Sequence, residues 1–225
     1  MVAHPVLAAI AAHTEAVERA EVRCTVERCP TCGHRPAAFK YHASRPRTFR
    51  VIVDRMVQAV ASALTRWKCP ACGKTFTLYP DFAVPHKHYV CQVVCRLSER
   101  YVADDKLSYR TGVQSNGRAV YYDAGAGDSQ ALDDRVLWPS TLYRWVGWLG
   151  RLRQTLREAL QLIRAQSAAC DVFRDLVALP PWKYRSERRK GVLQACGRLF
   201  RADGAYRQFF QTSIFPHLAT VCRWR

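Results

Sequence analysis

The sequence predicts an α+β fold in which a small β-rich segment precedes a mainly helical region. Two observations indicate the β-rich segment: the pattern Cys-Pro-x-Cys-Gly occurs at 29–33 and again at 69–73, and β-forming residues dominate the stretch between them. A third observation indicates the helices, because from about Pro85 onward apolar residues recur at three- and four-residue steps. The predicted regions are 1–22 (an N-terminal helix), 23–84 (β-rich), 85–166 (helical, with an inserted loop at 114–139) and 167–225 (C-terminal, helical).

The N-terminal region reads as a short amphipathic helix. Its apolar residues share one helical face: Val2, Leu7, Ile10, Ala11 and Val17. A secretory signal is not expected, because no basic residue precedes the apolar stretch and Glu15 and Glu18 follow it closely. The chain also lacks an apolar run of about 18 residues, so no membrane span is predicted.

The β-rich segment is expected to hold two strands before the second cysteine pair. The tripeptide Arg45-Pro46-Arg47 interrupts the apolar pattern and predicts a turn between these strands. Residues 59–64 fit a strand and a helix equally well.

The most regular helix is predicted to begin at Ser140, which follows Pro139 and would serve as the N-cap. One continuous apolar stripe then runs to Ile163, through Leu142, Val146, Leu149, Leu152, Leu156 and Leu160. Upstream, 90–101 and 107–113 are candidate supporting helices of a helix-turn-helix. The loop at 114–139 is longer than the usual turn of that motif, so either an interrupted version or a plain amphipathic bundle fits.

The doubled cysteine pattern predicts one structural Zn²⁺ bound by Cys29, Cys32, Cys69 and Cys72, which makes 23–84 a zinc ribbon. Two residues between cysteines allow one tight turn to place both sulfurs on one ion. Cys24 could compete as a metal ligand, but a buried thiol is the favoured interpretation. A second set, His86, His88, Cys91 and Cys95, has metal-ligand residue types but fits the core of a helix as well, and both readings stay open.

The charge predicts a polyanionic partner, with nucleic acid first and an anionic membrane second. The net charge is +17, and between Arg28 and Thr75 ten basic residues face one acidic residue, Asp54. The helix from Ser140 is the candidate for reading bases, through Thr141, Arg144 and exposed aromatic residues such as Tyr143 and Trp148. The predicted nucleic-acid contacts are Arg35, Lys40, Arg45, Arg47, Arg50, Arg55, Arg66, Lys68, Lys74, Thr141, Arg144, Arg151, Lys183, Arg185, Arg188, Arg189 and Lys190.

Residues 28–90 resemble the N-terminal zinc ribbon of bacterial insertion-sequence transposases and of small transposon-associated zinc-ribbon proteins. The resemblance rests on 29–33, on 66–77 (Arg-Trp-Lys-Cys-Pro-Ala-Cys-Gly-Lys-Thr-Phe-Thr), on 80–82 (Pro-Asp-Phe) and on Pro85-His86; it extends loosely to 140–149. It implies a following helix-turn-helix that binds double-stranded transposon-end DNA, a transposase or other transposition protein as partner, and a bacterial cytoplasmic, nucleoid-associated location.

The transposases continue into a ribonuclease-H-like catalytic domain that needs well over 100 residues, whereas about 60 remain here after the long helix. The expected function is therefore non-enzymatic: a zinc protein of a mobile element that recognises transposon-end or target-site DNA, with no catalytic residues. The alternatives are a protein-interaction adaptor or transcriptional regulator whose basic ribbon docks an acidic partner, a metal enzyme built on His86 and His88, and an RNA-binding protein.

Overall fold

The computed structural model describes residues 4–122, 136–175, 182 and 185–215. The protein has the predicted α+β fold, and the described residues contain seven helices and a four-stranded antiparallel sheet. The helices are α1 (Pro5–Glu18), α2 (Cys91–Ala103), α3 (Tyr109–Gly112), α4 (Pro139–Leu149), α5 (Arg153–Gln166), α6 (Val172–Asp175) and α7 (Glu187–Phe210). The strands are β1 (Lys40–Val53), β2 (Met56–Lys68), β3 (Thr75–Leu78) and β4 (Tyr121–Tyr122).

The chain forms two compact units. The first contains Val57–Gln92 and the described residues up to Val53, and the second contains Asp54–Met56 and the described residues of Val93–Phe215. Among the described residues, no helix combines the length and the apolar character that crossing a membrane requires.

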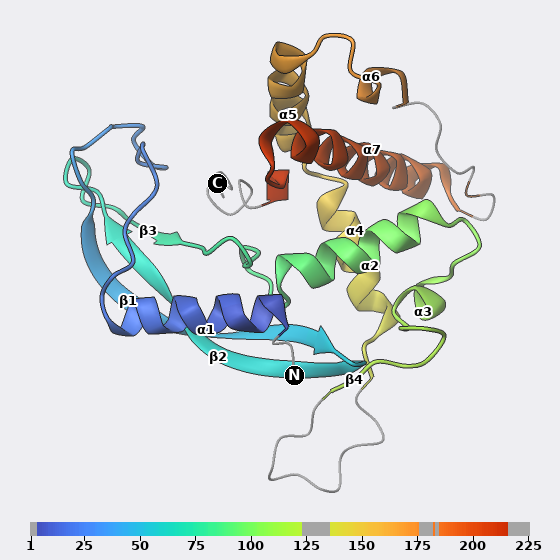
Figure 1. The fold of residues 1–225 in the computed structure, drawn as a ribbon, viewed down its shortest axis with the longest axis horizontal. Coiled ribbons are helices and arrows are strands. Elements are labelled where there is room, and N and C mark those ends of the chain that lie inside the picture. Colours follow the sequence, from blue (N-terminus) through green and yellow to red (C-terminus); the bar gives the residue numbers. More distant parts are fainter. Residues whose placement is uncertain (1–3, 123–135, 176–181, 183–184, 216–225) are drawn as a thin grey trace, which may run out of the picture. The chain divides into compact units, whose positions relative to one another are not determined.

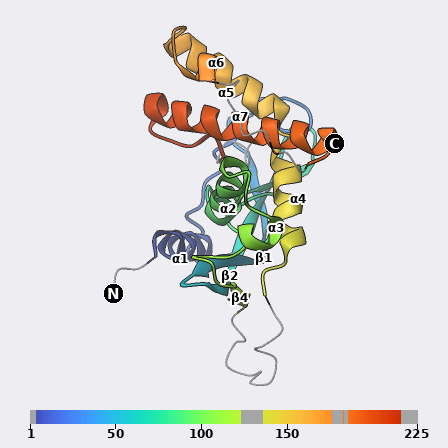
Figure 2. The ribbon, with the colours of Figure 1, turned by 90° about the vertical axis from the view of Figure 1, so that its right-hand side faces the viewer.

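A long β-hairpin is the main element of the first unit (Figure 1). The strand order is β1-β2-β3, with β4 also pairing with β2, and β3 runs antiparallel to β2 with Trp67 opposite Phe76 and Lys68 opposite Thr75. Helix α1 lies along the hairpin in both ribbon views (Figures 1 and 2) and is tied to β2, because the His13 ring nitrogen lies 3.0 Å from the Ala63 carbonyl oxygen and Thr14 donates to Ser62. The apolar core of this unit includes Ile10, Phe49, Val51, Leu64 and Val90.

The predicted turn at Arg45-Pro46-Arg47 is wrong. Residues 40–53 form one uninterrupted strand, and the chain reverses instead at Asp54 and Arg55, where φ is +47° and +67°. Positive φ at both central residues is the geometry of a two-residue hairpin turn whose twist matches that of the strands. Pro46 is tolerated because β1 lies at the end of the strand order, where a missing backbone N–H breaks no necessary ladder bond. Residues 59–64, for which a strand and a helix fitted equally, lie in β2.

The second unit contains α2 from Val93 onward, helices α3 to α7 and the short strand β4. Helix α7 packs against α4 and α5, and α3 packs against α4, as Figures 1 and 2 both show. The short α3 is closed by a reciprocal capping box, in which Ser108 Oγ accepts from the Thr111 amide and Thr111 Oγ1 accepts from the Ser108 amide. Buried side chains from four helices form the core: Leu97, Tyr101, Leu142, Trp145, Val146, Leu149, Ile163, Leu193, Cys196 and Leu199.

The single helix predicted from Ser140 to Ile163 is two helices, α4 and α5, separated at 150–152. The predicted N-cap at Ser140 is wrong, because the cap lies two residues earlier, at Trp138, and Pro139 takes the first helical position, where its fixed φ suits a helix start. The break follows Gly150, which lies so close to α7 that an added Cβ would stand 2.8 Å from the Val192 carbonyl oxygen. The apolar stripe stays continuous across the break, which explains why periodicity alone does not reveal it.

Candidate metal centre and basic surface

The four cysteines of the doubled motif come together as predicted. The sulfur atoms of Cys29, Cys32, Cys69 and Cys72 all lie within 4.8 Å of one another. Two of the separations are 3.7 Å (Cys29 to Cys72) and 3.9 Å (Cys32 to Cys69). A tetrahedral ion with metal–sulfur bonds of about 2.3 Å requires sulfur–sulfur edges of about 3.8 Å. The cluster therefore has the dimensions of a site that can hold a metal ion.

The two halves of the cluster are built by the same local turn. In each half the glycine amide donates to the first cysteine's carbonyl oxygen, over 2.9 Å from Gly33 to Cys29 and 3.0 Å from Gly73 to Cys69. Both glycines have positive φ, +71° and +67°, which a residue with a Cβ rarely adopts. The Thr31 amide also points at the Cys29 sulfur, 3.4 Å away. The motif thus encodes the turn as well as the ligands.

The thiols of this cluster have strongly altered pKa values. Burial raises the pKa of Cys29, but hydrogen bonds from the backbone of Cys32 and Thr31 and from neighbouring thiols outweigh it and lower the pKa to about 6. For Cys32 a backbone hydrogen bond from His34 lowers the pKa. Burial and the thiols of Cys29, Cys72 and Cys69 outweigh this bond and raise the pKa to about 12. The cluster thus favours one thiolate, and further thiolates would repel it. A bound cation relieves this repulsion.

No second metal site accompanies this cluster within the part of the chain that the structure describes, because His86, His88, Cys91 and Cys95 form no group of three donors close enough to share an ion. Cys91 and Cys95 lie on α2 and are half-buried, which agrees with their alternative role in helix packing. Cys24 is half-buried, and burial raises the pKa of its thiol despite a backbone hydrogen bond from Val26 that lowers it.

Eight of the predicted nucleic-acid contacts have exposed side chains: Arg35, Lys40, Arg45, Lys68, Lys74, Arg144, Arg151 and Arg188. We call Lys40, Arg45, Lys68 and Lys74 the ribbon cations. Two of them flank the second cysteine turn, since Lys68 precedes Cys69 and the carbonyl oxygen of Lys74 accepts a 2.9 Å bond from the Cys69 amide. The metal centre and part of the basic surface therefore share one local structure. Arg35 is paired with Glu27 at 3.1 Å.

Other predicted contacts are half-buried and bind within the protein. Arg47 donates to the Lys87 carbonyl oxygen over 2.8 Å, Arg66 donates to Thr75, and Arg50 lies 5.8 Å from the ring centre of Tyr89. Arg55 occupies the hairpin turn. These side chains support the hairpin and its neighbours, a role that the sequence did not indicate.

The second basic cluster, around residues 183–190, is also partly internal. Arg185 donates to the Tyr101 hydroxyl (2.7 Å) and the Leu107 carbonyl oxygen (3.2 Å), and Arg189 donates to the Tyr109 hydroxyl and the Tyr143 carbonyl oxygen (3.3 Å). Lys190 is paired with Glu187 at 2.6 Å, whereas Lys183 lies outside the described residues. Of this cluster, Arg188 is the member whose side chain the structure describes as exposed.

Helix α4, which was predicted to read DNA bases, presents a narrow exposed face. Ser140, Tyr143 and Arg144 are exposed and Thr141 is half-buried, but Trp148, which was expected on the surface, is buried with 4% exposure. Trp148 lies on the same buried face of α4 as Trp145 and Leu149, one helical turn from Trp145.

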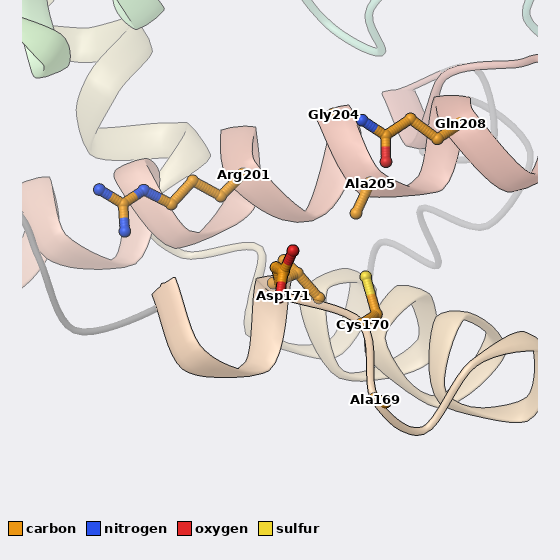
Figure 3. A pocket seen from close by; sticks show the side chains of 8 residues that line it. Ala169, Cys170, Asp171, Arg201, Gly204, Ala205 and Gln208 are labelled. Atoms are coloured by element: carbon orange, nitrogen blue, oxygen red, sulfur yellow. The ribbon is translucent and has the colours of Figure 1, made fainter.

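A cavity of about 640 Å³ lies in the second unit, between the segment that leads into α6 and the middle of α7 (Figure 3). Cys170 and Asp171 line one side, and Arg201, Ala205 and Gln208 line the other. The Asp171 carboxylate is also ion-paired with Arg174. No sequence motif marks this cavity, because its lining comes from two segments about 30 residues apart that only the packing of α7 brings together.

Comparison with known families gives a match to part of the chain. A family model described as a domain of unknown function (DUF6431) matches residues 29–113, so this stretch is similar to that family. The match begins at the first cysteine of the metal centre and includes all four, the strands β1 to β3 and the helices α2 and α3. Neither the curated proteins nor the solved structures contain a match to the chain.

Proposed function

We propose that this chain is a zinc-stabilised DNA-binding protein of a mobile genetic element, which recognises transposon-end or target-site DNA while a partner transposase supplies catalysis. The observation that carries the proposal is the four-cysteine centre with exposed basic residues on its own turns and strands. Four thiolates in a tetrahedron favour Zn²⁺ over harder divalent cations. The resemblance of residues 28–90 to transposase zinc ribbons supports the mobile-element context.

DNA is the proposed partner because the exposed charge around the metal centre is predominantly positive. Phosphate backbones bind Lys and Arg without needing a precise pocket, and each contact releases counterions. Within the part of the chain that the structure describes, the ribbon cations form no ion pair, whereas Arg35 is already paired with Glu27. The ribbon cations are therefore the first candidates for phosphate contacts, and Arg144, Arg151 and Arg188 are candidates in the second unit.

The test is a DNA-binding titration of the full chain across a salt series, with metal content measured on the same samples. We expect about one zinc per chain and an affinity that falls roughly 10³- to 10⁵-fold between about 50 and 200 mM salt if six to ten phosphate contacts form. The Cys69→Ser variant should lose both zinc and DNA binding. Cys24→Ser, which changes a half-buried thiol outside the cluster, should keep both.

Two results would contradict the proposal. Zinc without nucleic-acid binding at low salt would favour the protein-interaction adaptor, with the basic surface facing an acidic protein. Nuclease or strand-transfer activity of the purified chain that is lost when one carboxylate is replaced would contradict the non-catalytic role.

A further inference from the structure

The exposed face of α4 is a single narrow stripe. Ser140, Tyr143 and Arg144 are exposed, one helical turn apart, while the opposite face of the helix is buried. Tyr143 is 52% exposed, which is unusual for an aromatic residue on a helix whose other aromatic residues, Trp145 and Trp148, are buried.

The Tyr143 ring is held from beneath by a cation. The Arg189 guanidinium carbon lies 4.2 Å from the ring centre, and Arg189 also donates to the Tyr143 carbonyl oxygen over 3.3 Å. The Tyr109 ring meets the Tyr143 ring edge to face, with ring centres 5.4 Å apart at 75°. The guanidinium occupies one face of the ring, and Tyr143 is still 52% exposed beside these contacts.

Arg189 is itself fixed in place. It lies in the first turn of α7, where its amide donates to the N-cap Ser186 over 3.3 Å, and its Nε donates to the Tyr109 hydroxyl. The ring above this guanidinium is therefore ordered before any ligand arrives, which lowers the entropy cost of binding to it.

The surroundings of this ring are cationic. From Val136 to Arg153 the chain carries Arg144, Arg151 and Arg153 and no acidic residue. The Arg144 side chain is exposed one residue from Tyr143 and is steadied by 3.2 Å hydrogen bonds to the carbonyl oxygen and hydroxyl of Ser140. An ordered aromatic ring beside an exposed guanidinium suits a nucleotide, because the base can stack on the ring while the phosphate contacts the guanidinium.

We propose that Tyr143 is a stacking platform for one unpaired nucleobase, with Arg144 contacting an adjacent phosphate. The inference rests on the proposed DNA-binding function and adds the class of DNA that the second unit prefers: a duplex with an unpaired base over a fully paired one. A base within a paired stack exposes no face to the ring, whereas an unpaired base does.

The experiment compares two duplexes that share one strand containing a single 2-aminopurine, bound to the full zinc-loaded chain: in the first the complementary strand pairs with every base, and in the second it leaves the 2-aminopurine unpaired. Stacking of a base on an aromatic side chain contributes about 1–3 kcal/mol, so wild type should prefer the second duplex roughly 5- to 150-fold. Binding should also quench the 2-aminopurine fluorescence. Tyr143→Ala should remove the preference and the quenching and leave the affinity for the paired duplex nearly unchanged.

Three further variants keep the outcome interpretable if Tyr143→Ala unfolds. Tyr143→Phe and Tyr143→Trp preserve a stacking ring and should keep the preference. Phe209→Ala removes an aromatic residue that is 39% exposed on α7 in the same unit and should change nothing. Thermal unfolding of each variant separates a folding defect from a binding defect.

Three results would overturn the platform: wild type that binds both duplexes equally, Tyr143→Ala that retains the preference, or Tyr143→Phe that loses it. In each case salt-dependent binding of the paired duplex would leave the proposed function standing. Failure of wild type to bind either duplex at low salt would contradict the proposed function itself.

Discussion

The Arg185 guanidinium donates a 2.7 Å hydrogen bond to the hydroxyl of Tyr101, across 84 residues of sequence. Tyr101 is only 2% exposed, and the same guanidinium lies 5.7 Å from its ring centre and 5.4 Å from that of Tyr109. The contact joins α2 to the segment that enters α7. Arg185 is therefore part of the helical unit's structure, whether or not it also contacts a ligand.

Arg185→Ala should destabilise the protein by about 1–3 kcal/mol, because the buried Tyr101 hydroxyl loses one of its hydrogen-bond partners and the rings of Tyr101 and Tyr109 lose the guanidinium beside them. Arg188→Ala removes an exposed guanidinium three residues away and should change the free energy of unfolding by less than about 0.5 kcal/mol. Denaturant unfolding measures both. Equal, negligible effects would mean that Arg185 serves only in binding.

Two glycine substitutions should act in opposite directions. Gly150→Ala should destabilise by about 1–3 kcal/mol, because the new Cβ would stand 2.8 Å from the Val192 carbonyl oxygen, which cannot move without shifting α7. Gly191→Ala, at an exposed position of α7 with nothing within 4 Å, should stabilise by about 0.4–1 kcal/mol. Chemical denaturation of the two variants checks the pair, and a stabilised Gly150→Ala would mean that α4 and α7 are less closely packed than described.

The salt dependence of DNA binding should identify the phosphate contacts one by one. Replacing Arg45 or Lys68 with alanine should reduce the slope of log affinity against log salt by about 1 in each case. Arg19→Ala makes the same change in charge at the C-cap of α1, where Arg19 is exposed and paired with Glu15, and should leave the slope unchanged. Equal reductions in all three variants would show that net charge, and not the ribbon cations, sets the affinity.

Tyr109 should make the protein sensitive to alkali. Burial, together with a hydrogen bond with Tyr101, raises the pKa of the Tyr109 phenol, although the nearby Arg189 charge opposes the change. Folding then favours the protonated phenol, so the stabilisation is complete below the unfolded pKa of about 10 and is lost as the pH rises above it. Unfolding measured from about pH 7 to 11 should show this loss in wild type and a smaller loss in Tyr109→Phe.

The matched control for this experiment is Tyr41→Phe, which removes a hydroxyl from a residue that is 56% exposed in the first unit. It should lose stability with pH as wild type does. If Tyr109→Phe and wild type show the same dependence on pH, the phenol does not titrate as its surroundings indicate.

The sequence by itself determined the metal centre, the N-terminal helix and the division into a β-rich and a helical part. These features are local: two residues between cysteines, a glycine after each pair, and apolar residues at helical spacing carry the whole signal. The same local patterns explain why α2 and α3 lie close to where they were predicted, and α7 lies within the C-terminal region that was predicted to be helical. Binding of DNA and a role in transposition remain predictions that the experiments above address.

Only the tertiary structure decided what depends on distant partners. The hairpin turns at Asp54 and Arg55, and not at Pro46, because pairing with β2 extends the strand through the proline. The helix after Ser140 breaks near Gly150, where α4 closely approaches α7. Arg189 lies beneath Tyr143, and this contact between residues 46 apart turns a basic run and an exposed tyrosine into one ordered surface. Local spacing encodes ligands and periodicity, whereas close approach and cation–aromatic contacts arise only when the helices pack.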